Sequence, residues 1–321
     1  MSKIILAALV LSLSAHAYAE DQKSEGQSSL KVEDVNGQKN KVDGDIDQEI
    51  TNAKLRAESG SKSKFSLSTT AQYSGGAISA PFAAERPNLS GLPGQQRLSS
   101  LSGGLNGRYR MTKNDSFTAG TTYAVMTPFE GDVTPGQKQT NVFDPNIGYN
   151  HVAKVGAFQT VASIGYAYGT SNESQSIDLT HQFGVAYNAM HAFQNGLSVG
   201  AQVASDYNVY TSAPGQNTAD TQTPTYGHDK RVAWDFAIYP QAEYQFNDTF
   251  SARTVFGYFN WKHLYGDPNK ERLLHTYNYQ SVGVGISVAR DVFLYPNIQF
   301  VPDNIRSDFT NFALAATINV F

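Results

Sequence analysis

The sequence predicts an all-β protein, a transmembrane antiparallel up-and-down β-barrel of about twelve strands. Three observations support this fold class. Apolar side chains alternate with small or polar ones from residue 64 onward, the connections between the alternating stretches are short and long in turn, and no stretch after the first 20 residues could form a spanning helix. The composition agrees, with 18 Tyr, 18 Phe and 27 Gly but only 16% charged residues.

The individual strands are predicted from a period of two. The stretch FSLSTTAQY (65–73) puts Phe, Leu and Tyr on one face and Ser, Thr and Gln on the other. The same alternation recurs over 101–110, 116–125, 182–188, 197–203 and 234–238. Each predicted strand therefore has one apolar face, suited to lipid, and one small or polar face, suited to a lumen.

The connections distinguish a barrel from a soluble sandwich. Short ones fall at 112–115, 153–156, 189–195, 247–249 and 289–291, and longer ones near 75–96, 127–141, 169–175, 211–230, 262–272 and 301–308. Eleven alternating connections give twelve strands, with short periplasmic turns, long outer loops and both termini in the periplasm. A secreted β-sandwich has no reason to sort its loops by length.

Aromatic residues lie where the predicted strands end. One group is next to the short turns and comprises Tyr109, Phe117, Tyr149, Phe158, Tyr187, Tyr244, Phe246 and Phe250. A second group is nearer the long loops and comprises Tyr123, Phe143, Tyr166, Tyr207, Trp234 and Tyr258. Two bands of amphipathic rings are favoured at the two interfaces of a membrane.

The first residues have the pattern of an export signal. Lys3 precedes an apolar run over 4–13, and small residues at positions 17 and 19 fit a signal peptidase that cleaves between Ala19 and Glu20. A run of about ten residues is too short for a membrane anchor, which needs roughly 20. We therefore assign residues 1–19 to a cleaved signal peptide.

Residues 20–63 form a polar extension ahead of the predicted barrel, which spans 64–321. Residues 20–64 hold ten acidic and eight basic side chains and no aromatic one. Such a composition is typical of a mostly disordered segment, here one in the periplasm. The spacing over 46–58 allows one short amphipathic helix. We favour a solvated linker over a helix that blocks a pore or binds a partner.

The chain ends on Phe321 after the alternating stretch FTNFALAATINVF. This architecture and ending resemble the bacterial outer-membrane β-barrel superfamily, porin-like members included. The resemblance implies that the assembly machinery of the outer membrane reads the last strand. The alternating apolar positions 312–320 are one step out of phase with Phe321. We therefore expect a bulge or a shifted face between Asn311 and Phe321, or recognition that tolerates the shift.

The polar phase contains the candidate site residues. Hairpin registers predict an ion pair of Glu243 with Arg253 in the lumen, because the two are equidistant from residue 248. Similar registers predict an arc of three carboxylates near the outer mouth, formed by Asp178, Asp206 and Asp235, above a basic periplasmic end with Arg108 and Arg110. The arc would attract cations, with solvated carboxylates in a wet lumen as an equally weighted alternative.

The function predicted is a narrow porin-like channel for passive diffusion of small solutes or ions across the outer membrane. Its partners are outer-membrane lipid, the barrel assembly machinery, and solutes that the sequence does not identify. A net charge of −4 does not indicate nucleic acid, the absence of cysteine excludes thiolate chemistry, and no cofactor motif is present.

Two other classes remain open at the sequence level, an outer-membrane enzyme of lipase or protease type and a non-conducting structural or adhesive barrel. An enzyme needs a nucleophile or an activated water beside a base. His228–Asp229 is the only neighbouring pair of histidine and acid, and no serine is near it in the sequence. We therefore predict a protein that is not an enzyme.

Overall fold

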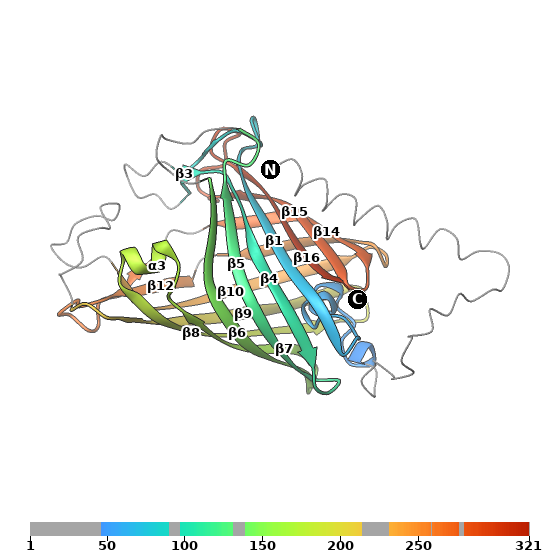
Figure 1. Ribbon diagram of the computed structural model, residues 1–321. Helices are drawn as coiled ribbons and strands as arrows, with labels where there is room; N and C mark the ends of the chain where they lie inside the picture. Colours follow the sequence, from blue (N-terminus) through green and yellow to red (C-terminus); the bar gives the residue numbers. More distant parts are fainter. Residues whose placement is uncertain are drawn as a thin grey trace.

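A computed structural model describes residues 46–89, 97–130, 139–213, 231–257, 259–275 and 279–320. Fourteen strand segments form one antiparallel sheet that closes on itself (Figure 1). Closure occurs because β1 (Phe65–Ala77) pairs on one side with β4 (Ser100–Arg110) and on the other with β16 (Asn311–Val320).

The wall of the barrel contains twelve strands, as predicted. After β4 come β5 (Asp115–Met126), β6 (Thr140–Val155), β7 (Phe158–Tyr168), β8 (Leu179–Ala192), β9 (Leu197–Tyr210) and β10 (Val232–Gln245). Next, β11 (Phe250–Phe256) and β12 (Phe259–Leu264) both pair with β10 and form one wall strand. The following wall strand consists of β13 (Leu274–His275) and β14 (Gln280–Ala289), and β15 (Val292–Phe300) then leads to β16.

The outer face of the barrel is apolar. Phe65, Ile147 and Phe246 are 63%, 59% and 63% exposed, whereas the intervening residues Ser66 and Ser68 are buried on the inner face. This is the inverse of a soluble protein, because strands in water expose their polar phase. The two phases therefore follow the predicted alternation, and the outer one is suited to lipid.

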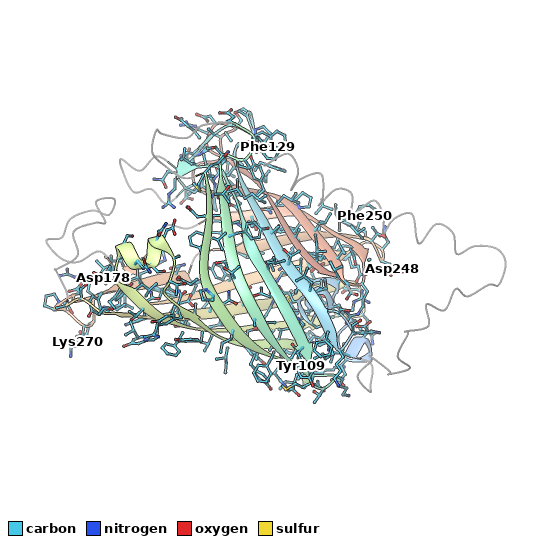
Figure 2. All side chains as sticks on the ribbon, viewed as in Figure 1. Tyr109, Phe129, Asp178, Asp248, Phe250 and Lys270 are labelled. Atoms are coloured by element: carbon cyan, nitrogen blue, oxygen red, sulfur yellow. The ribbon has the colours of Figure 1, made fainter. Side chains whose placement is uncertain are left out.

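The two ends of the barrel differ. Connections 111–114, 156–157, 193–196, 246–249 and 290–291 meet at one end, which we call the short-turn end. At the other, the long-loop end, connection 78–99 contains the small hairpin of β2 (Glu85–Arg86) and β3 (Arg97–Leu98), and 169–178 contains α3 (Asn172–Ser176). Figure 2 shows Tyr109, Asp248 and Phe250 toward the short-turn end and Phe129, Asp178 and Lys270 toward the other. None of the helices in the described ranges is long and apolar enough to cross a membrane.

The last strand keeps its alternation without a bulge over its paired residues. Its register with β1 is unbroken from Leu67 opposite Val320 to Ser74 opposite Ala313, and the irregularity lies beyond Ser74, toward Ala77. The expected bulge or shifted face is therefore absent between residues 313 and 320. Phe321 lies outside the described residues.

Residues 46–63, which we call the inner segment, occupy the short-turn end of the lumen (Figure 1). They contain a 3-10 turn, η1 (Ile46–Gln48), and a helix, α2 (Ala53–Glu58), capped by the Asn52 side chain, which accepts a hydrogen bond from the Leu55 N–H at 3.1 Å. The preference for a solvated linker is thus wrong for this segment, because its apolar face is buried against the wall. Residues 20–45 lie outside the described ranges.

Candidate functional site

The middle of the lumen is a cavity of about 770 Å³. Residues of β1, of β4 to β9 and of α3 line it, and most of them are Gly, Ser, Thr or Asn. Small side chains leave the interior unfilled, and their hydroxyl and amide groups can bind water or a polar solute. Asp144 and Asp206 are the acidic residues among its described lining.

Apolar contacts are the first of the interactions that hold the inner segment at the short-turn end. Ile46, Ile50 and Leu55, each at most 2% exposed, pack against Val152, Val161 and Met190 of β6, β7 and β8. Fully burying such a side chain stabilises a protein by roughly 1.5–3 kcal/mol. These three wall residues are apolar exceptions on the polar phase, so the wall is built to receive the segment.

Arginines then bind the carboxyl end of α2. Arg108 and Arg110 donate to the Ser59 carbonyl oxygen at 2.8 and 2.6 Å, and Arg290 donates to the Gly60 carbonyl oxygen at 2.7 Å. The last carbonyl groups of a helix have no partner within it and carry partial negative charge, so cations are stabilised there. Arg108 and Arg110, predicted as a basic end of the lumen, therefore bind the inner segment and do not face an open pore.

Gly60 is required at the end of the helix. Its φ is +80°, and a Cβ atom there would lie 2.4 Å from Nη1 of Arg108. A residue with a side chain would be strained by the backbone conformation and would displace the guanidinium. Asn319 of β16 also holds the helix, because its side chain donates to the Ala57 carbonyl oxygen at 2.8 Å.

Ion pairs add to the attachment of the inner segment. Asp47 contacts Arg290 at 2.9 Å and Lys62 at 2.9 Å. Burial alone would raise the pKa of Asp47, but hydrogen bonds from Arg290 and Lys62 outweigh it, so the pKa is lowered. Asp47 therefore stays ionised at neutral pH, and its contribution to docking is lost only when the pH falls below the ordinary range of a carboxyl group.

The structure places Glu243 of β10 directly opposite Arg253 of β11. Their side chains form an ion pair at 3.1 Å and are 5% and 3% exposed. Glu243 also accepts hydrogen bonds from Ser251 at 2.7 Å and from Asn52 of the inner segment at 3.1 Å. This buried pair therefore links the wall to the inner segment.

The predicted arc of three carboxylates is not formed. Asp206 of β9 lies opposite Asp235 of β10, as expected. On the β8 side, however, the residue opposite Asp206 is Gly184 and not Asp178. Asp178 lies at the end of α3 and accepts a hydrogen bond from Ser212 at 2.7 Å. The prediction fails because the β8–β9 hairpin turns around residue 195, at Gly196 with a φ of +87°, three residues beyond the turn centre assumed from the sequence.

Asp206 and Asp235 remain opposed as like charges, which destabilises a sheet. Lys262 lies opposite Asp235 on the next strand and offsets part of this repulsion. We expect Asp206→Asn to raise the free energy of unfolding by about 0.2–1 kcal/mol, measured by urea unfolding in detergent micelles. Asp248→Asn, in an exposed short turn, is the control and should change nothing; a loss of stability in Asp206→Asn would contradict the prediction.

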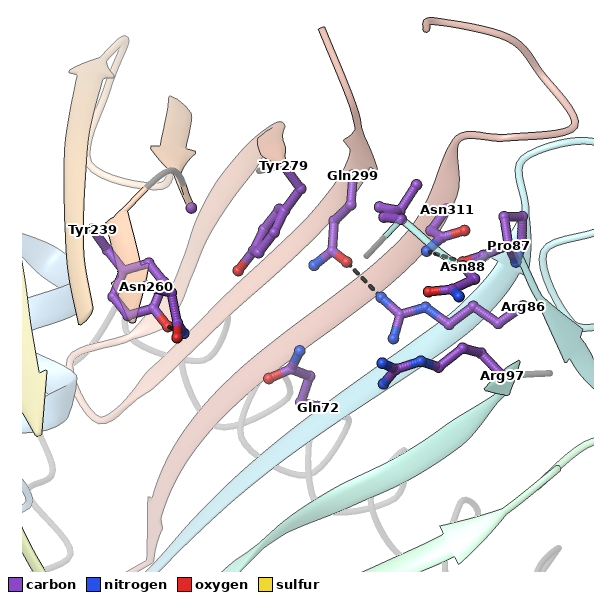
Figure 3. A pocket seen from close by; sticks show the side chains of 12 residues that line it. Gln72, Arg86, Pro87, Asn88, Arg97, Tyr239, Asn260, Tyr279, Gln299 and Asn311 are labelled. Atoms are coloured by element: carbon purple, nitrogen blue, oxygen red, sulfur yellow. Dashed lines mark hydrogen bonds between the residues drawn. The ribbon is translucent and has the colours of Figure 1, made fainter. Parts of the chain in front are cut away.

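A second cavity, of about 290 Å³, lies toward the long-loop end (Figure 3). Arg86 and Arg97 of the β2–β3 hairpin line it on one side, and Tyr239 and Asn260 of β10 and β12 line it on another. Sequence reasoning missed these arginines because they lie in a connection and have no periodic pattern. Their only signal is two cations, eleven residues apart, that flank a stretch of sequence with Pro and Gly.

In the described ranges, no group of three or more His, Asp or Glu side chains could hold a metal ion. His228 and Asp229, the pair weighed for catalysis, lie outside the described residues, as do Ala19 and Glu20.

Comparisons with known proteins bear on the fold. No protein-family model matches the chain, and no curated protein matches it in sequence. Among solved structures, an outer membrane channel from Pseudomonas putida F1 is similar over 82% of this chain and 97% of its own, with a TM-score of 0.50 and 10% identity. The NanC porin matches with a TM-score of 0.39 and 9% identity, over 79% of this chain and 98% of its own.

OmpF of Salmonella typhi, in complex with daunomycin, matches with a TM-score of 0.35 and 10% identity, over 82% of this chain and 98% of its own. At 10% identity, the similarity to the Pseudomonas channel is one of fold. The chain therefore has the closed β-barrel fold found in outer-membrane channels.

Proposed function

We propose that this protein is an outer-membrane channel for passive diffusion of small polar solutes, with its inner segment acting as a plug. The observation that carries the proposal is a cavity of about 770 Å³ with small polar walls, inside a closed barrel whose outer face is apolar. Twelve strands enclose more space than an eight-stranded barrel, whose interior side chains fill, and the small residues of this wall leave that space open.

The proposal includes an orientation and a route. The signal peptide is cleaved between Ala19 and Glu20, the assembly machinery recognises the last strand with Phe321, and the short-turn end faces the periplasm. Both termini then lie in the periplasm, and the inner segment controls the periplasmic exit. Two pairs of aromatic rings at the short-turn end support a position at a membrane interface. The ring centroids are 5.1 Å apart in the pair of Phe65 with Tyr109 and 5.5 Å apart in the pair of Phe117 with Tyr149.

Conductance in a planar lipid bilayer tests the proposal. The mature chain (20–321) and a chain lacking 20–63 should be refolded and recorded under the same salt. We expect the shortened chain to show a larger unitary conductance, because the short-turn end is then open. Absence of current in both chains, each shown to be folded by circular dichroism, would contradict the channel function.

A further inference from the structure

The cavity of about 290 Å³ toward the long-loop end has an unusual distribution of charge. Arg86 and Arg97 are direct cross-strand partners in the β2–β3 hairpin, and Figure 3 shows their guanidinium groups side by side. Among the described residues that line the cavity, none is acidic. Like charges opposed across a hairpin repel each other, so this arrangement favours an anion between them.

Arg86 is held in place with part of its hydrogen-bonding capacity unused. Its Nη2 donates to Oε1 of Gln299 at 2.7 Å, while its buried Nε has no partner among the described residues. Burial first, and then the charge of Arg97, lower the pKa of Arg86. A bound carboxylate would raise the pKa of Arg86 again, because it would pair with the guanidinium charge.

The rest of the cavity wall is neutral and polar. Tyr239 of β10, Asn260 of β12 and Gln72 of β1 present hydroxyl and amide groups, and Tyr279, the residue before β14, presents a further hydroxyl (Figure 3). Such groups can both donate and accept hydrogen bonds, so they can pair with hydroxyl groups on a solute. An anion whose remaining groups are apolar would leave them without hydrogen bonds. The cavity is near the lower limit for small-molecule sites, roughly 300 Å³, so a monomer fits better than an oligomer.

We propose that this cavity is a binding site for a monomeric sugar acid, whose carboxylate lies between Arg86 and Arg97 and whose hydroxyl groups contact the opposite wall. The inference rests on the proposed channel function and deepens it, because such a site would select the solutes that enter the lumen. It differs from the predicted cation-attracting mouth, since the cavity's charged residues are basic.

Calorimetric titration of the refolded mature chain with D-glucuronate tests the site without requiring conduction. D-glucose is the control that has the sugar hydroxyl groups but no carboxylate. Inorganic phosphate is the control that has the negative charge but no sugar. We expect glucuronate to bind more tightly than either. Arg86→Gln with Arg97→Gln should weaken glucuronate binding at least tenfold, about 1.4 kcal/mol, because both charges are removed. Lys270→Gln with Arg306→Gln, which removes two exposed charges outside the cavity, should leave the affinity unchanged.

The outcomes separate this inference from the channel function. Equal binding of glucose and glucuronate, equal binding of phosphate and glucuronate, or unchanged affinity in the arginine double variant would each overturn the sugar-acid site, whatever the conductance. Glucuronate binding that depends on the two arginines, in a protein without current in any form, would support the site and contradict the channel.

Discussion

Replacing Glu243 with methionine should lower the free energy of unfolding by about 3–5 kcal/mol, because it leaves a buried guanidinium without its carboxylate. Arg253 is 3% exposed and its Nη1 lies 3.1 Å from Oε2 of Glu243. The loss includes the hydrogen bonds that Glu243 accepts from Ser251 and Asn52. Urea unfolding in detergent micelles, followed by circular dichroism, measures the change.

Two controls show whether the loss comes from the unpaired charge. Replacing both Glu243 and Arg253 with methionine should recover much of the stability, because an ion pair replaced as a whole leaves no orphan charge. Arg306→Gln breaks a pair with Asp308 in which both side chains are more than 60% exposed, at 61% and 64%, and should have no measurable effect. If Glu243→Met lowers the free energy of unfolding no more than Arg306→Gln does, the pair of Glu243 and Arg253 is exposed to solvent, which would contradict a buried network.

Replacing Arg108 and Arg110 together with glutamine should release the inner segment from the lumen. The two arginines donate at least four hydrogen bonds to carbonyl oxygens of residues 59–61 in the inner segment. Hydrogen bonds from a charged group contribute roughly 1.5–3 kcal/mol each. Even partial loss should therefore shift the docking equilibrium by well over tenfold, which corresponds to about 1.4 kcal/mol.

The absence of cysteine makes this release measurable. Ala57 is 1% exposed at the centre of the docked segment, so Ala57→Cys places a single thiol where a reagent cannot reach it. We expect slow thiol labelling in the otherwise native chain and labelling at least tenfold faster with Arg108→Gln and Arg110→Gln. The double replacement of Arg86 and Arg97 is the control, and it should leave labelling slow. Equal rates in all three chains would show that these arginines do not hold the segment.

The wall of the barrel could be predicted because its rules are local. The alternation of apolar and polar residues predicts which face of the sheet each side chain occupies. Where the centre of a hairpin turn is known, it also predicts which residue lies opposite on the neighbouring strand. For the hairpin around Asp248, this arithmetic places Glu243 opposite Arg253, as the structure has them. The β8–β9 hairpin shows the limit of the method, since Asn195–Gly196 is the stronger turn signal and the assumed centre ignored it.

The contents of the lumen could not be predicted in the same way. The arginines on the wall bind backbone carbonyl groups of the inner segment, and a carbonyl group is present in every residue, so no sequence pattern marks the contact. Arg86 lies in the connection between β1 and β4, and the alternation of the wall strands does not predict where a residue of a connection lies. What alternation does show is an inner face with Val152, Val161 and Met190 in place of polar residues.

The attachment of the inner segment has a consequence for the order of events in biogenesis. Asp47 is 243 positions from Arg290, and Ala57 is 262 positions from Asn319. The inner segment therefore obtains its last partners only after the final strand has been synthesised and paired. Contacts of such sequence separation form slowly, so full attachment of the segment marks completion of the barrel, and an unfinished molecule would hold it only through the contacts with β4 and β6 to β8.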